Sequence, residues 1–126
     1  MATAEIKLEL SPHAPAAARK LAREVAGEVF DPARVNDFVL ATSEVVSASV
    51  HEGSADWIHV RLSSYPRVLV GAIDSRSTNW TEDEEFRGIY LAHSLLDAAC
   101  SRWRANALPT GLYVWFWVRA DQPAAG

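Results

Sequence analysis

The chain has 126 residues, of which 49% are hydrophobic and 22% charged, with a formal net charge of −4 and one cysteine, Cys100. This length fits one domain with its own core, and a lone cysteine excludes an internal disulfide or a multi-cysteine metal site. The negative charge gives no support to nucleic-acid binding by bulk electrostatics. With no secretory signal and no apolar run of membrane-spanning length, we expect a cytoplasmic protein that binds neither nucleic acid nor membrane directly.

The N-terminal third of the chain carries one strand signal and two helix signals. Residues 5–10 (EIKLEL) alternate charged and apolar side chains, which predicts a half-buried strand. Ser11-Pro12 and Asp31-Pro32 are typical helix starts, because a capping side chain precedes a proline. They predict one helix to about Phe30 and a second helix over residues 33–52.

The helix predicted at residues 33–52 has two distinct faces. Its core-facing side is mostly apolar and comprises Val35, Phe38, Val39, Thr42, Val45, Val46, Ser49 and Val50. The opposite side carries small residues around a carboxylate and comprises Asp37, Ala41, Glu44, Ala48 and His51. Small side chains beside a carboxylate suit the floor of a cleft. The alternative is a surface helix whose alanines serve helix propensity.

The remaining chain predicts strands around a long loop and a third helix. Alternation predicts a strand at 56–63, and a continuously apolar run predicts a central strand at 68–73 that stops at Asp74. Residues 75–86 are polar and aperiodic, which predicts a loop long enough to serve as a functional lid. Helical spacing of apolar residues predicts a third helix at 88–99.

The C-terminal residues predict a β-hairpin and a tail. Residues 102–107 and 112–119 are two strand-like runs around Pro109-Thr110-Gly111. Residues 121–126 predict a disordered tail, so one domain is expected over residues 1–120. The order of elements predicts an α+β two-layer sandwich, with a mainly antiparallel mixed sheet and helices on one of its faces.

The last predicted strand alternates aliphatic and aromatic side chains. If its aliphatic residues face the helices, then Tyr113, Trp115 and Trp117 face away. Trp57 and Trp103 are expected to join them from other strands. Aromatic side chains gathered on an open sheet face indicate a surface for a protein partner. The alternative is a self-covering aromatic layer flanked by the side-chain stems of Arg102, Arg104 and Arg119.

Four segments, in this order, carry a resemblance to a known family: SEVVSASVHEG, VLVGAIDS, FRGIYLAHSLLD and GLYVWFWV. From about Leu8 to Val118 the chain resembles the GHKL (Bergerat) ATPase fold, and within it the anti-sigma-factor serine kinases of the RsbW and SpoIIAB type. The resemblance implies a homodimer that holds a sigma factor inactive. Such a protein releases the sigma factor on binding an anti-anti-sigma (STAS) protein, whose serine it phosphorylates with ATP and Mg²⁺.

The same resemblance assigns roles to individual residues. Glu44 stands at the position of the catalytic base, and Asp74 stands where the family binds adenine. Arg87 and Gly88 stand beside the expected phosphates. Ala48, however, replaces the Asn that ligates Mg²⁺ in the family, and a methyl group cannot coordinate a metal.

Further departures in the loop indicate that nucleotide binding is weak or lost. Phe86 replaces the first glycine of the family's phosphate-binding turn, and residues 82–85 are four consecutive carboxylates that would repel a triphosphate. No metal ligands are predicted, since the histidines share no ligand spacing. We therefore expect a regulatory protein that holds a partner. The alternatives are an active ATP-dependent serine kinase that uses Glu44 and a non-catalytic dimeric scaffold.

Overall fold

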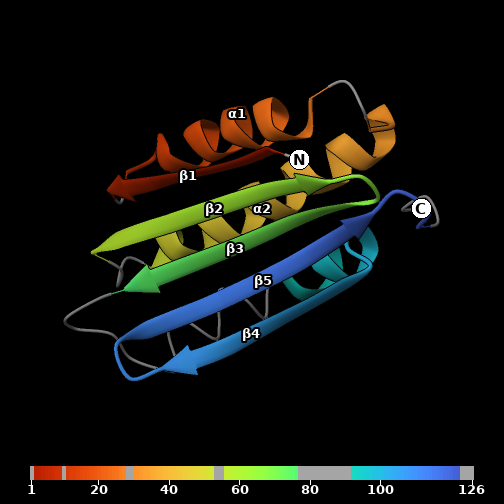
Figure 1. The fold of residues 1–126 in the computed structure, drawn as a ribbon. Helices are drawn as coiled ribbons and strands as arrows, with labels where there is room; N and C mark the ends of the chain where they lie inside the picture. Colours follow the sequence, from red (N-terminus) through yellow and green to blue (C-terminus); the bar gives the residue numbers. More distant parts are fainter. Residues whose placement is uncertain (1, 10, 28–29, 53–55, 77–91, 123–126) are drawn as a thin grey trace.

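The computed structural model describes residues 2–9, 11–27, 30–52, 56–76 and 92–122, and every structural statement below concerns these residues. The elements are β1 (Ala2–Glu9), α1 (Ala14–Ala26), α2 (Pro32–Glu52), β2 (Trp57–Tyr65), β3 (Val68–Arg76), β4 (Arg102–Leu108) and β5 (Gly111–Arg119). Residues 92–99 form a further helical segment. Figure 1 shows the helices on one face of the sheet.

The strands form one open sheet in the order β1-β2-β3-β5-β4, and each of its pairings is antiparallel. The fold is therefore α+β, with a five-stranded antiparallel sheet and three helical segments among the described residues. This agrees with the expected two layers and with helices on one face. The expectation of a mixed sheet is wrong for these strands, because all four pairings are antiparallel and two of them, β2–β3 and β4–β5, are hairpins with two-residue turns.

The core lies between the helices and the alternate residues of each strand that face them. Leu69 and Ile73 of β3 are fully buried there, as is Phe116 of β5. The Phe116 ring meets Phe38 of α2 with ring centroids 5.8 Å apart. Gly71 makes room for this ring, because a Cβ at that position would lie 2.2 Å from it. The aromatic pair thus joins the central helix to the middle of the sheet.

The helix ends differ slightly from the predicted ones. Asp31 caps α2 as predicted, since its carboxylate accepts a hydrogen bond from the Ala33 N–H at 2.8 Å. Helix α1 begins at Ala14 rather than at Ser11-Pro12. It stops at Ala26 rather than near Phe30, because Gly27 follows with a positive φ of 61° that ends the helix.

Strand β3 continues past its predicted end to Arg76. The prediction of a loop at Ser75 is wrong because β3 pairs on both sides, with β2 and with β5, up to its last residue. The Ser75 hydroxyl is also satisfied, at 2.8 Å from the hydroxyl of Ser49 on α2. The remainder of the predicted loop, residues 77–86, lies outside the described residues, as do residues 88–91 of the predicted third helix.

The end of the domain also differs from the prediction. A disordered tail was expected from Asp121, but Gln122 is held by both ends of its side chain. Its amide oxygen accepts from the Arg119 N–H at 3.0 Å, and its amide nitrogen donates to the Ala99 carbonyl at 2.7 Å. The domain therefore includes Gln122. Residues 123–126 of the predicted tail lie outside the described part of the chain.

Candidate functional site

The predicted adenine-binding residue, Asp74, lies on the open face of the sheet. Its neighbour Ser75 is buried against Ser49 of α2, so Ser75 faces the helices. Because successive strand residues point to opposite faces, Asp74 points away from the helices. Its carboxylate is engaged by Arg76, whose Nε lies 2.8 Å away. Asp74 therefore lies on the face opposite the helix layer that contains Glu44.

Asp74 instead belongs to a shallow hollow on the open face. The cross-strand neighbours of Asp74 are His59 on β2 and Tyr113 on β5. The hollow has a volume of about 220 Å³ and is lined by His59, Arg61, Ala72, Asp74 and Tyr113. Neither the base candidate nor any other residue of the helices contributes to its lining.

The aromatic residues of β5 lie on the open face as predicted. Val114 and Phe116 are buried under the helices, while Tyr113 and Trp115 are half-buried and Trp117 is 39% exposed on the other side. The rings of Trp115 and Trp117 are neighbours, with centroids 5.6 Å apart. Among the described residues no element covers this face (Figure 1).

Trp57 joins the open face, whereas the prediction for Trp103 is wrong. Trp57 of β2 is paired with Arg76, and the ammonium of Lys7 lies 4.6 Å from its ring. Trp103 is paired with Phe116 and therefore faces the helices. Its indole N–H donates to Asp97 at 2.8 Å, in the helical segment at 92–99. Whether Trp103 shares a face with Trp115 and Trp117 of the adjacent strand β5 depends on the register between β4 and β5. The sequence does not fix that register.

Two arginines of β4 complete the aromatic part of the face. Arg102 is paired with Trp117, and its guanidinium lies 6.0 Å from the Trp117 ring and 5.7 Å from the Trp115 ring. Arg104 is paired with Trp115. From the sequence, both arginines were expected only in the alternative interpretation, in which their stems cover the aromatic layer. The alternation in Arg102-Trp103-Arg104 was the available signal, because it forces both arginines to the face opposite Trp103.

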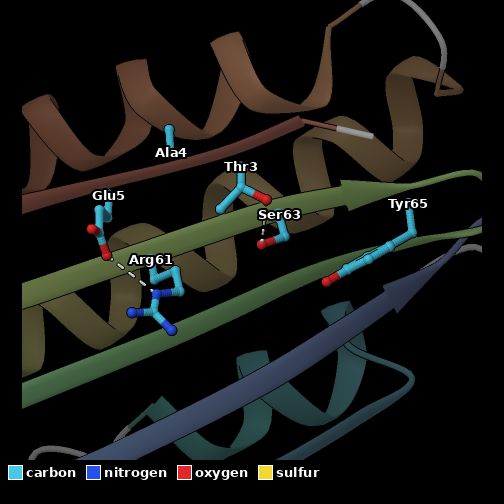
Figure 2. A pocket seen from close by; sticks show the side chains of 6 residues that line it. All are labelled: Thr3, Ala4, Glu5, Arg61, Ser63 and Tyr65. Atoms are coloured by element: carbon cyan, nitrogen blue, oxygen red, sulfur yellow. Dashed lines mark hydrogen bonds and ion pairs between the residues drawn. The ribbon is translucent and has the colours of Figure 1, made fainter.

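The other side of the open face, over β1 and β2, carries matched charges (Figure 2). Arg61 Nε and His59 Nε2 each lie 3.2 Å from the same carboxylate oxygen of Glu5. Thr3 donates a hydrogen bond to Ser63 at 3.3 Å. A hollow of about 450 Å³ lies here, lined by Thr3, Ala4, Glu5, Arg61, Ser63 and Tyr65.

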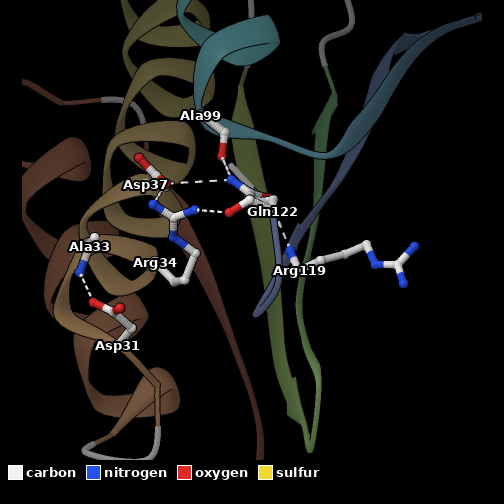
Figure 3. Close-up of polar contacts among 7 residues, drawn as sticks. All are labelled: Asp31, Ala33, Arg34, Asp37, Ala99, Arg119 and Gln122. Atoms are coloured by element: carbon white, nitrogen blue, oxygen red, sulfur yellow. Dashed lines mark hydrogen bonds and ion pairs between the residues drawn. The ribbon is translucent and has the colours of Figure 1, made fainter. Parts of the chain in front are cut away.

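On the helix side, part of the predicted cleft floor on α2 is filled. Asp37 and Ala41 were expected to line a cleft, but they are 6% and 0% exposed. The reason is that Gln122 and the end of the helical segment at 92–99 lie against this side of α2 (Figure 3). Glu44 and Ala48, further along the helix, are half-buried.

Asp37 belongs to a buried polar network that joins three parts of the chain (Figure 3). Its Oδ2 lies 3.3 Å from Arg34 Nη2 and 3.4 Å from the Gln122 amide nitrogen. Arg34 also donates to the Gln122 main-chain carbonyl. Burial raises the pKa of Asp37 and outweighs the attraction of Arg34, which lowers it. The network links α2, residues 92–99 and the end of β5, so its role is structural.

The remaining predicted site residues lie beyond what the structure describes. Arg87, Gly88 and Phe86 fall within residues 77–91, together with the acidic residues 82–85. Within the described residues, no group of three or more His, Cys, Asp or Glu side chains is arranged to hold a metal ion. Cys100 is buried, and desolvation raises the pKa of its thiol to about 12.

Comparison with known proteins does not assign the chain to a family. No protein-family model matches the chain, and no curated protein is detectably similar to it in sequence. No helix among the described residues is long and apolar enough to cross a membrane. The fold is that of an α+β protein whose sheet has helices on one face and, within the described ranges, no element on the other.

Proposed function

We propose that the chain is a regulatory binding protein that acts by partner switching in transcription control, in the manner of an anti-sigma factor. The observation that carries this proposal is the sheet face with Tyr113, Trp115 and Trp117, which no described helix or strand covers. Aromatic residues are enriched in protein interfaces because a large apolar surface is buried with little loss of side-chain entropy. The helix order and the one-sided helix layer support a GHKL-like fold as part of the proposal.

The same proposal assigns the chain no phosphotransfer activity. Transfer of a phosphoryl group needs a base, a metal ion and the triphosphate in one constellation. Glu44 lies on the helix side, next to the methyl group of Ala48, while Asp74 is held by Arg76 on the opposite face. A binding function requires none of these contacts. In this proposal the partner is a sigma factor or an anti-anti-sigma (STAS) protein, and the chain is a homodimer.

Calorimetric titration with ATP and Mg²⁺ tests the absence of nucleotide chemistry. We expect no saturable binding with a Kd below about 1 mM. The reason is that Ala48 cannot coordinate Mg²⁺ and the Asp74 carboxylate lies on the sheet face opposite the helices. A low-micromolar Kd would refute this part of the proposal.

In that case the rival, an active serine kinase, is tested with radiolabelled ATP and a candidate antagonist protein. Transfer that is lost in Glu44→Ala but kept in Glu24→Ala would establish the kinase. Glu24 is a suitable control because it is an exposed carboxylate on α1.

A further inference from the structure

The charges on the open face are distributed unevenly between its two halves. On the half formed by β1, β2 and β3, the carboxylates of Glu5 and Asp74 each have an arginine partner, Arg61 and Arg76 respectively. The ion pairs are formed within this half of the face, so Glu5 and Asp74 offer little unmatched charge to a partner.

The half formed by β4 and β5 differs. Arg119 at the end of β5 is paired with Asp121, but Arg102 and Arg104 of β4 have no carboxylate partner among the described residues. Arg102 lies over the rings of Trp115 and Trp117, and Arg104 donates to the main-chain carbonyl of Trp103 at 2.9 Å. Neither Arg102 nor Arg104 forms an ion pair with any carboxylate that the structure describes. Arg102 and Arg104 are therefore two positive charges beside Trp115 and Trp117 without a carboxylate partner among the described residues. The chain as a whole has a net charge of −4.

We propose that Arg102, Arg104, Trp115 and Trp117, here called the arginine–tryptophan surface, bind an acidic segment of the partner protein. The inference rests on the proposed function and adds the chemistry of the partner. Alternate residues of a strand are about 7 Å apart, which is close to the spacing of residues one turn apart on a helix. Two carboxylates at that spacing reach both arginines, while apolar side chains between them cover the tryptophans.

Two other occupants fit the surface less well. A second copy docking face to face would have to present carboxylates to Arg102 and Arg104, but two of those on its sheet face, Glu5 and Asp74, are already paired with arginines of the same chain. A nucleic acid is bound by neutralising many phosphates, whereas this half of the face offers two unmatched arginines on a negatively charged chain. The distribution of charge therefore favours an acidic protein segment.

Fluorescence anisotropy with two synthetic peptides tests the inference. One labelled helical peptide carries leucines flanked by two glutamates one turn apart, and its match carries glutamines at the same places. We expect the glutamate peptide to bind about tenfold more tightly than the glutamine peptide, since two arginine–carboxylate pairs form. The double variant Arg102→Glu/Arg104→Glu should remove this preference.

The matched control is Lys20→Glu/Arg23→Glu on α1, which makes the same change in net charge at two exposed positions. Its affinity for the glutamate peptide should stay within about twofold of the wild type, because the sheet face is unchanged. If circular dichroism shows that the glutamate variant of β4 is unfolded, Arg102→Gln/Arg104→Gln replaces it and should lose the preference as well.

Four results would overturn the inference. They are equal affinity for the two peptides, no binding of either, an equal loss in the α1 control, and tighter binding of a single-stranded oligothymidylate than of the glutamate peptide. A dimer in sedimentation that Arg102→Glu/Arg104→Glu dissociates, without peptide binding, would assign the surface to a second copy. The absence of nucleotide chemistry, the other part of the proposed function, is tested separately by the ATP titration, which involves no residue of this surface.

Discussion

Gly71→Ala is expected to lower the free energy of unfolding by about 3 kcal/mol, the upper end of the usual cost of overfilling a core. The added methyl group would lie 2.2 Å from the Phe116 ring, which is fully buried. The ring cannot move aside because Phe38 of α2 lies against it with centroids 5.8 Å apart. Urea unfolding followed by tryptophan fluorescence measures the loss.

A double-mutant cycle shows whether Phe116 causes this loss. Phe116→Leu alone should cost about 1 kcal/mol, but Gly71→Ala/Phe116→Leu should be more stable than Gly71→Ala, because the smaller side chain frees the space that the methyl group needs. If the two losses simply add, then Gly71 is required for some reason other than the ring.

Asp37→Ala is expected to cost about 3 kcal/mol at neutral pH, as is usual when one partner of a buried ion pair is removed. Arg34 is 5% exposed and would lose the carboxylate that lies 3.3 Å from its guanidinium. Asp37→Asn should cost only about 1 kcal/mol, because an amide oxygen still accepts from Arg34 and the carboxylate at position 37 no longer has to be buried in its ionised form. Chemical unfolding of both variants measures the difference.

The pH dependence of these variants follows from the raised pKa of Asp37. The folded protein keeps the Asp37 proton to higher pH than the unfolded chain does, because burial disfavours the ionised form. Protonated Asp37 therefore stabilises the fold at low pH, and this contribution is lost as the pH rises through the folded-state pKa. The stability advantage of the wild type over Asp37→Asn should shrink from about pH 4 to pH 7. An advantage that grows instead would mean that the attraction of Arg34 outweighs burial.

Alternation and helix starts predicted most of the fold, because both are local. The aliphatic residues of β5 face the helices, and Asp31 caps α2, as the sequence indicated. The end of β3 was missed because pairing on both sides overrides the polar character of Ser75. No local pattern reveals such pairing.

The candidate site was predicted less completely, because it depends on register and on distant contacts. Trp103 was assigned to the open face, but its register partner Phe116 faces the helices. Asp37 was assigned to a cleft, but Gln122, far along the chain, covers it. Arg102 and Arg104 were expected only as stems flanking the aromatic layer, because their cross-strand neighbours, Trp117 and Trp115, depend on the register.

The most direct measurement of the central claim compares two positions for a photo-reactive amino acid in living cells. One replaces Trp117 on the open sheet face, and the other replaces Leu40, which is 48% exposed on α2 in the helix layer. The proposed binding mode predicts a covalent adduct with a partner protein from position 117 and none from position 40. An adduct from position 40 with none from position 117 would contradict it.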